Sequence, residues 1–89
     1  MKVVKKVNGI KLSDTKYYSL IWGKTDMHLR AALQQEKVPF GYAVKYEGST
    51  QYTYHINERD LREYIGEEAW QEGLLRVQEY TKEQKEKSS

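Results

Sequence analysis

The stretch LQQEKVPFGYAVKYEGSTQYTYHI, residues 33–56, begins in one secondary-structure pattern and ends in another. Its first part is rich in glutamine and must stop at Pro39, because a proline pushes the residue before it towards extended geometry. Its second part alternates, with aromatic and β-branched residues at every second position over 42–46 and again over 52–56. The short polar segment 47–50, which contains a glycine, joins the two runs. The stretch therefore predicts the end of a helix, a stop and a β-hairpin.

The helix that ends in this stretch is predicted over residues 25–37. Thr25 is a good N-cap, and Asp26 follows it in the first turn, where the helix dipole favours an anion. Apolar residues at the spacing of a buried stripe are Leu29, Ala32 and Leu33. The opposite face, its flanks and the last turn carry Met27, Arg30, Ala31, Gln34, His28, Gln35 and Lys37.

The segments on either side of this core stretch also carry helical signals. Residues 14–22 follow a potential cap at Ser13 or Asp14 and end at Gly23, but the run KYYSLIW is equally rich in strand formers, so helix and strand both stay open. Residues 57–66 predict a helix with an Asn57 cap and a stop at Gly66. Residues 1–13 predict either a basic arm or a short hairpin that turns at Asn-Gly.

A final helix is predicted after Gly66, with an apolar stripe of Trp70, Leu74 and Val77. Gly73 lies inside it and lowers its helix propensity by about 1 kcal/mol relative to alanine. The polar tail 81–89 is expected to fray. The stripe must bury either against its own domain or against a partner, and we consider the second a candidate interface with a recombinase or a second copy of the chain.

Length and composition exclude several classes of function. Eighty-nine residues predict one domain with a modest core, which leaves little room for a catalytic cleft. Without cysteine, and with only two distant histidines, the sequence indicates no metal site, and no cofactor or small-molecule substrate is expected. No catalytic motif is present, so we do not expect an enzyme. No apolar run has the length of a membrane span or a signal peptide, so we expect no membrane partner and a cytoplasmic protein.

The charge is divided unevenly along the chain. Residues 1–45 contain nine Lys/Arg and three Asp/Glu, a balance of +6, whereas residues 46–89 contain six and ten, a balance of −4. A basic half beside an acidic half indicates a polyanion on one side and another kind of contact on the other, although two solvated surfaces would give the same counts.

A protein that reads DNA needs a helix whose exposed face is narrow enough for a major groove and carries donors for base edges and phosphates. Residues 25–37 fit this need: Arg30 can contact guanine and Gln34 adenine, while Met27 can touch a thymine methyl group. Ala31 lets the backbone approach, and the helix start at Thr25 offers N–H groups to a phosphate. An ordinary surface helix would share many of these features.

The order of segments resembles the small winged helix-turn-helix proteins of phages and mobile elements, the excisionase-like group related to MerR-type domains. The resemblance covers residues 14–66 and rests on Gly23 and Thr25 in a turn between two helices, on LQQ at 33–35, on PFG and AVK at 39–45, and on YTYHI at 52–56. It favours a helix for residues 14–22. Tyr17, Tyr18 and Ser19 depart from the small apolar residues that the family usually places there.

The resemblance implies an α+β fold: two helices, a β-hairpin wing and a closing helix over residues 14–66, preceded by residues 1–13 and followed by an extra C-terminal helix and tail over 67–89. It also implies an architectural DNA-binding protein of a bacterial host cell, an excisionase that steers an integrase or a small transcriptional regulator. Double-stranded DNA is then the expected partner. The expected contacts are Lys24, Thr25, Met27, His28, Arg30, Ala31, Gln34, Gln35 and Lys37 on and around the second helix, and Lys45, Ser49, Thr50 and Gln51 in the wing.

The main alternative is a protein-binding module, such as a phage-encoded inhibitor. It would use the acidic C-terminal helix and the tyrosine-rich hairpin, because eight tyrosines favour an interface of either kind.

Overall fold

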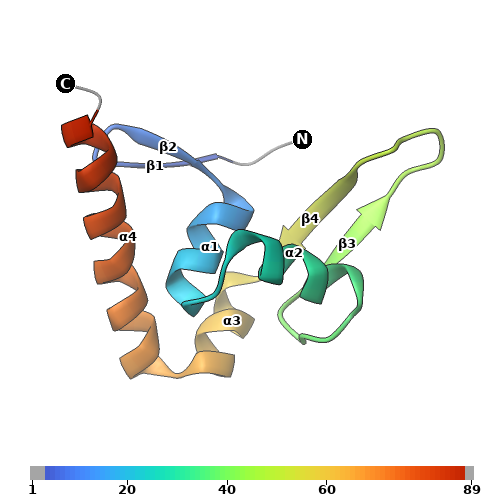
Figure 1. Ribbon diagram of the computed structural model, residues 1–89. Coiled ribbons are helices and arrows are strands. Elements are labelled where there is room, and N and C mark those ends of the chain that lie inside the picture. The colour runs from blue at the N-terminus through green and yellow to red at the C-terminus, as the bar shows by residue number, and fades with distance from the viewer. Residues whose placement is uncertain (1–3, 88–89) are drawn as a thin grey trace.

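The computed structural model describes residues 4–87 and is coloured along the chain in Figure 1. Within this range the protein has an α+β fold of four helices and two antiparallel hairpins, which confirms the predicted class. The elements follow one another as β1 (Val4–Val7), β2 (Ile10–Ser13), α1 (Asp14–Trp22), α2 (Asp26–Gln34), β3 (Gly41–Lys45), β4 (Tyr52–Ile56), α3 (Glu58–Ile65) and α4 (Glu67–Lys87). No helix in the described part of the chain is both long and apolar enough to cross a membrane.

Helix α1 decides between the two structures left open for residues 14–22, because the segment is helical. Its N-cap is Ser13, whose hydroxyl accepts a hydrogen bond from a backbone N–H of the first turn at 3.3 Å. It ends at Gly23, whose φ of 82° is left-handed and is adopted by glycine without strain. The strand-forming side chains are used for packing instead, since Tyr18 and Ile21 are buried in the core.

Helix α4 packs along α1 and completes the core (Figure 1). The two helices lie close together at Gly73, where a Cβ atom would lie 2.4 Å from the carbonyl oxygen of Ile21. Close packing therefore explains a glycine that weakens the helix locally. About one turn later, Arg76 Nη1 donates to the carbonyl oxygen of Leu20 at 2.6 Å. Arg76 thus supplies a cation to the C-terminal end of α1, whose own last turn has no basic residue.

The apolar stripe of α4 belongs to this core, so its proposed role as a contact for a partner is corrected. Trp70 and Val77 are 4% and 2% exposed, and Leu74 packs against the same cluster. The stripe thus follows the first of the two alternatives left open for it, burial against its own domain. On the outer side of α4, Leu75 is exposed.

Of the N-terminal segment 1–13, residues 1–3 lie outside the described residues, and residues 4–13 form a hairpin that α4 holds. Its turn is formed by Asn8 and Gly9, which both have positive φ, and Leu12 of β2 is buried in the core. Asn8 Nδ2 donates to the hydroxyl of Thr81 at 3.1 Å. Thr81 is buried although it begins the polar tail that we expected to fray, and the helix continues to Lys87. The hairpin and the end of α4 therefore stabilise each other.

Among residues 4–87, the contacts of the second hairpin, β3–β4, with the helices lie at its base and as far as Tyr54 in the middle of β4. Its register places Gly41 opposite Ile56 and Lys45 opposite Tyr52. Tyr54 and Ile56 share the face that packs towards α2 and the core. A Cβ atom on Gly41 would lie 3.0 Å from Leu33 Cδ2, so the base of β3 lies directly against α2. The far end of the hairpin extends away from the helices (Figure 1).

Candidate nucleic-acid interface

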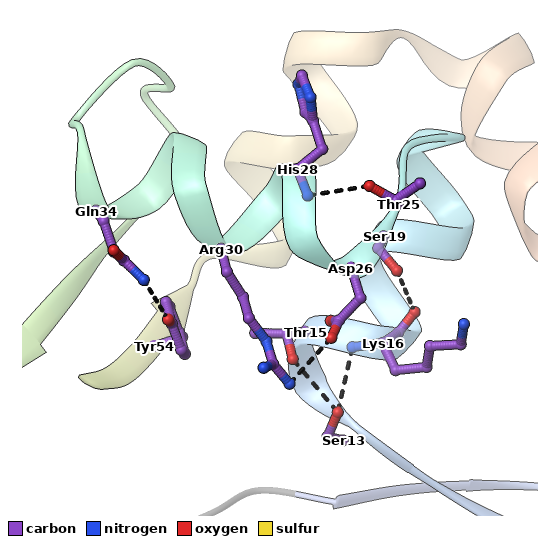
Figure 2. Close-up of polar contacts among 10 residues, drawn as sticks. All are labelled: Ser13, Thr15, Lys16, Ser19, Thr25, Asp26, His28, Arg30, Gln34 and Tyr54. Carbon is purple, nitrogen blue, oxygen red and sulfur yellow. Dashed lines mark hydrogen bonds and ion pairs between the residues drawn. The ribbon is translucent and has the colours of Figure 1, made fainter. Parts of the chain in front are cut away.

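Three side chains of α2, spaced one turn apart, form a polar row: Asp26, Arg30 and Gln34 (Figure 2). Arg30 Nη2 lies 2.9 Å from Asp26 Oδ2, and the Arg30 side chain is 49% exposed. A guanidinium has five N–H donors, so an ion pair through one nitrogen leaves most of them for another ligand. The ion pair therefore restricts the position of the guanidinium but leaves most of its N–H groups available to a ligand.

Tyr54 of β4 contacts two members of this row, Gln34 and Arg30. Gln34 Nε2 donates to Tyr54 Oη at 2.6 Å, as the dashed line in Figure 2 shows. The guanidinium carbon of Arg30 lies 5.9 Å from the centre of the Tyr54 ring, within the range of a cation–π attraction. The structure thus brings the two side chains predicted to read bases together on one strand residue.

The other predicted contacts on and around α2 lie on two sides of the helix. Met27 is 80% exposed and Ala31 is half-buried, and both lie opposite the buried stripe. His28 is also exposed, but it points away from Arg30 (Figure 2), and its ring lies 5.4 Å from that of Trp22. The remaining four are all exposed: Lys24, Thr25, Gln35 and Lys37.

The β3–β4 hairpin presents its predicted contacts at two places. Lys45 lies on the same face as Tyr54, and its Nζ is 5.8 Å from the centre of the Tyr52 ring. At the tip, Ser49 Oγ accepts from the backbone N–H of Gln51 and donates to its carbonyl oxygen, both at 3.1 Å. The Ser49 hydroxyl thus closes the turn instead of standing free, whereas the neighbouring Thr50 is exposed.

The basic half of the sequence is divided between two parts of the fold. Lys24, Arg30, Lys37 and Lys45 lie on or next to α2 and on β3, where the carboxylates Asp26, Glu36 and Glu47 offset part of their charge. Lys5, Lys6 and Lys11 lie on the first hairpin and Lys16 on α1. Two of these bind aromatic rings of the protein itself: Lys5 Nζ lies 5.7 Å from the ring centre of Tyr17 and Lys16 Nζ lies 4.6 Å from that of Tyr80. The surface around α2 is therefore only moderately basic.

A groove runs between the start of α1 and strand β4, and Thr15, Arg30, Tyr54 and His55 are among its lining residues. Close to it, the hydroxyl of buried Tyr18 donates to Glu58 Oε1 at 3.2 Å. Burial, and then the negative charge of Glu58, raise the pKa of Tyr18 above its ordinary range. Tyr18 is therefore a structural donor at neutral pH. Among the described residues, no group of three His, Asp or Glu side chains is placed to hold a metal ion.

Sequence reasoning did not single out Asp26 or Tyr54 as members of this site. The Asp26–Arg30 pair was recognisable, because the two residues are four apart on one helix. The position of Tyr54 was not, since alternation in a strand says which residues share a face and not which face meets the neighbouring helix.

No protein-family model, curated protein or solved structure matches the chain.

Proposed function

We propose that the protein is a winged helix-turn-helix DNA-binding protein, with α2 as the recognition helix and the β3–β4 hairpin as the wing. The observation that carries this proposal is the common surface formed by the polar row of α2 and by the wing face with Lys45 and Tyr54. A helix with donors on its exposed side can read base edges, and an adjoining hairpin with a cation can contact phosphates.

The side chains of the recognition helix support sequence-specific contacts. Arg30 keeps free N–H donors for guanine, and Gln34 keeps one N–H and its oxygen for adenine. Half-buried Ala31 leaves room for a close approach of the helix, and exposed Met27 offers an apolar contact. The moderate charge of this surface supports an affinity that depends on base contacts as well as on phosphates.

Selection from a randomised duplex library, followed by fluorescence anisotropy on the selected site, tests the proposal. We expect specific binding that weakens steeply with salt, because phosphate neutralisation releases counterions. Arg30→Ala is expected to weaken specific binding by about 1–3 kcal/mol and to relax base preference at one position. Arg30→Lys keeps the charge but loses the fork of donors, so it is expected to relax the same position with little change in salt dependence.

Lys82→Ala is the control for charge, because it removes one positive charge from the outer side of α4. It is expected to leave both affinity and specificity unchanged. Failure to select any sequence, or equal effects of Arg30→Ala and Lys82→Ala, would contradict the assignment of α2.

The resemblance to excisionase-like proteins favours an architectural role, in which the bound protein bends DNA near a recombination site and steers an integrase. A small transcriptional regulator of the host cell would use the same contacts. Energy transfer between dyes at the two ends of the selected duplex distinguishes the roles, since an architectural protein brings the ends closer on binding.

A second candidate function is protein binding through the outer face of the hairpin. Tyr42 and Tyr46 are 53% and 59% exposed there, and the rings of Tyr42 and His55 are stacked with centroids 5.0 Å apart. Exposed tyrosines are frequent in protein interfaces. Paired Tyr42→Ser and Tyr46→Ser substitutions separate the two candidates: they would abolish binding to a protein partner and leave DNA affinity unchanged.

A further inference from the structure

We infer that Tyr54 is a positioning residue that sets the specificity of the recognition helix from the wing strand. This inference rests on the proposed function. Tyr54 is half-buried on β4, and it contacts two residues of α2 that lie 20 and 24 positions earlier in the chain. The wing then has a second role besides phosphate contact, because it orients the side chains that read bases.

The hydrogen bond to Tyr54 fixes Gln34 in a form suited to adenine. A glutamine amide has two N–H donors and one acceptor oxygen, and the Tyr54 hydroxyl takes one of the donors at 2.6 Å. One N–H and the oxygen remain, which is the pair that an adenine edge requires. Without Tyr54 the amide of an exposed side chain would rotate freely, and binding would have to order it.

Arg30 is held in a similar way from two sides. Asp26 binds one nitrogen of its guanidinium at 2.9 Å, while the ring of Tyr54 lies 5.9 Å from the guanidinium carbon. The first contact comes from the same helix and the second from the wing. A change in the position of β4 would therefore displace both readers together, so the wing and the recognition helix act as one unit.

Tyr54→Phe removes only the hydroxyl and keeps the ring, so it tests the bond to Gln34. Affinity for the selected duplex is expected to fall roughly 3- to 10-fold, the effect of one lost hydrogen bond. The loss should be confined to the base that Gln34 contacts, and the salt slope should not change. In a Gln34→Ala background, Tyr54→Phe should have no further effect, because the partner is already absent.

Tyr52→Phe is the matched control. Tyr52 lies on the same strand and the same face, it is exposed, and Gln34 binds Tyr54 and not Tyr52. The control should leave the preference for the Gln34 base unchanged. Unchanged base preference in Tyr54→Phe, or a full effect of Tyr54→Phe in the Gln34→Ala background, would overturn the inference.

A measurement on the free protein keeps this test independent of the proposed function. The side-chain amide of Gln34, observed by nuclear magnetic resonance, should be restricted in the parent protein and mobile in Tyr54→Phe. A parent protein that binds no DNA but shows this restricted amide would overturn the proposed function and the role in specificity, and would leave only the positioning of Gln34 by Tyr54. An amide equally mobile in both proteins would overturn the role of Tyr54 whether or not DNA binds.

Discussion

The two hairpins of this protein have strands of similar length, four residues in the first and five in the second, and differ in what holds them. The first, β1–β2, sends Leu12 into the core and is bonded at its turn, through Asn8, to Thr81 of α4. The second, β3–β4, packs against α2 at its base, while its tip is bonded only within itself by Ser49 and extends outward. The first hairpin is therefore packed into the core, whereas the second projects from the side of the molecule that carries the polar row of α2.

This difference shows that the neighbouring element determines whether a hairpin is held in the core or projects from it. A two-stranded hairpin is marginally stable alone, so it must be supported by a neighbouring element. The C-terminal helix supports the first hairpin at its turn and Leu12 anchors β2 in the core, whereas the second hairpin receives support from α2 at its base. Under the proposed function, this free end is the part of the hairpin that would reach the DNA backbone.

The largest expected effect is that of removing α4. A chain that ends at Gly66 loses Trp70, Val77 and Thr81 from the core, and it exposes the side of α1 and the first hairpin that they cover. We expect no cooperative unfolding transition by circular dichroism, because a domain this small has only a few kcal/mol of stability to lose. A chain that ends at Lys82 keeps all three residues and should stay folded. A folded, cooperative chain ending at Gly66 would show that α4 is dispensable.

A single methyl group at the α1–α4 contact gives the next largest effect. Gly73→Ala would raise helix propensity by about 1 kcal/mol, but the new Cβ would meet the backbone of Ile21 at 2.4 Å. Backbone atoms cannot move aside as a flexible side chain can, so the steric clash should outweigh the gain in helix propensity. We expect the free energy of unfolding to fall by about 1–3 kcal/mol. Glu72→Ala, at an exposed position of the same helix, should change it by less than about 0.5 kcal/mol.

The bond between the first hairpin and α4 is tested by Thr81→Val, which keeps the shape of the side chain and removes its hydroxyl. Asn8 loses its acceptor, so we expect a loss of about 1 kcal/mol in unfolding free energy. Amide hydrogen exchange should become faster in β1 and β2 and remain unchanged in β3 and β4. The matched control is Thr53→Val in β4, which should change neither the unfolding free energy nor the amide exchange of β1 and β2. Faster exchange in both hairpins would mean that they are not supported independently.

The base of the second hairpin is tied to α1 by the bond from Tyr18 to Glu58, just after β4. Tyr18→Phe should lower the unfolding free energy by about 1 kcal/mol at neutral pH. Because folding raises the pKa of Tyr18, its contribution is fully present below the unfolded pKa of roughly 10 and is lost as pH rises through the folded pKa. The difference between parent and variant should therefore be constant near neutral pH and shrink above about pH 10. A difference that does not depend on pH would contradict the assigned bond.

The same contrast between the hairpins separates what the sequence could predict from what it could not. Turn residues and alternation predicted the second hairpin and gave the first as one of two alternatives, and capping residues such as Thr25 predicted where helices begin. The packing of α4 was not predictable, because an apolar stripe such as that of Trp70 has the same pattern whether it meets its own domain or a partner. The contacts of Tyr54 with α2 were not predictable for a related reason, because periodicity is local and these contacts depend on tertiary structure.

The smallest expected effect concerns the cations of the two hairpins in DNA binding. Lys45 of β3 lies on the face of the second hairpin that also carries Tyr54, whereas exposed Lys11 of β2 lies on the hairpin that α4 holds. If Lys45 neutralises one phosphate, Lys45→Ala should weaken binding to all sequences about equally and lower the salt slope by roughly 1. Lys11→Ala should change neither quantity, although it removes the same charge from a strand of similar length. Equal salt slopes in the two variants would contradict the division between a supporting hairpin and a DNA-contacting one. A loss confined to some sequences in Lys45→Ala would instead mean that the wing reads bases.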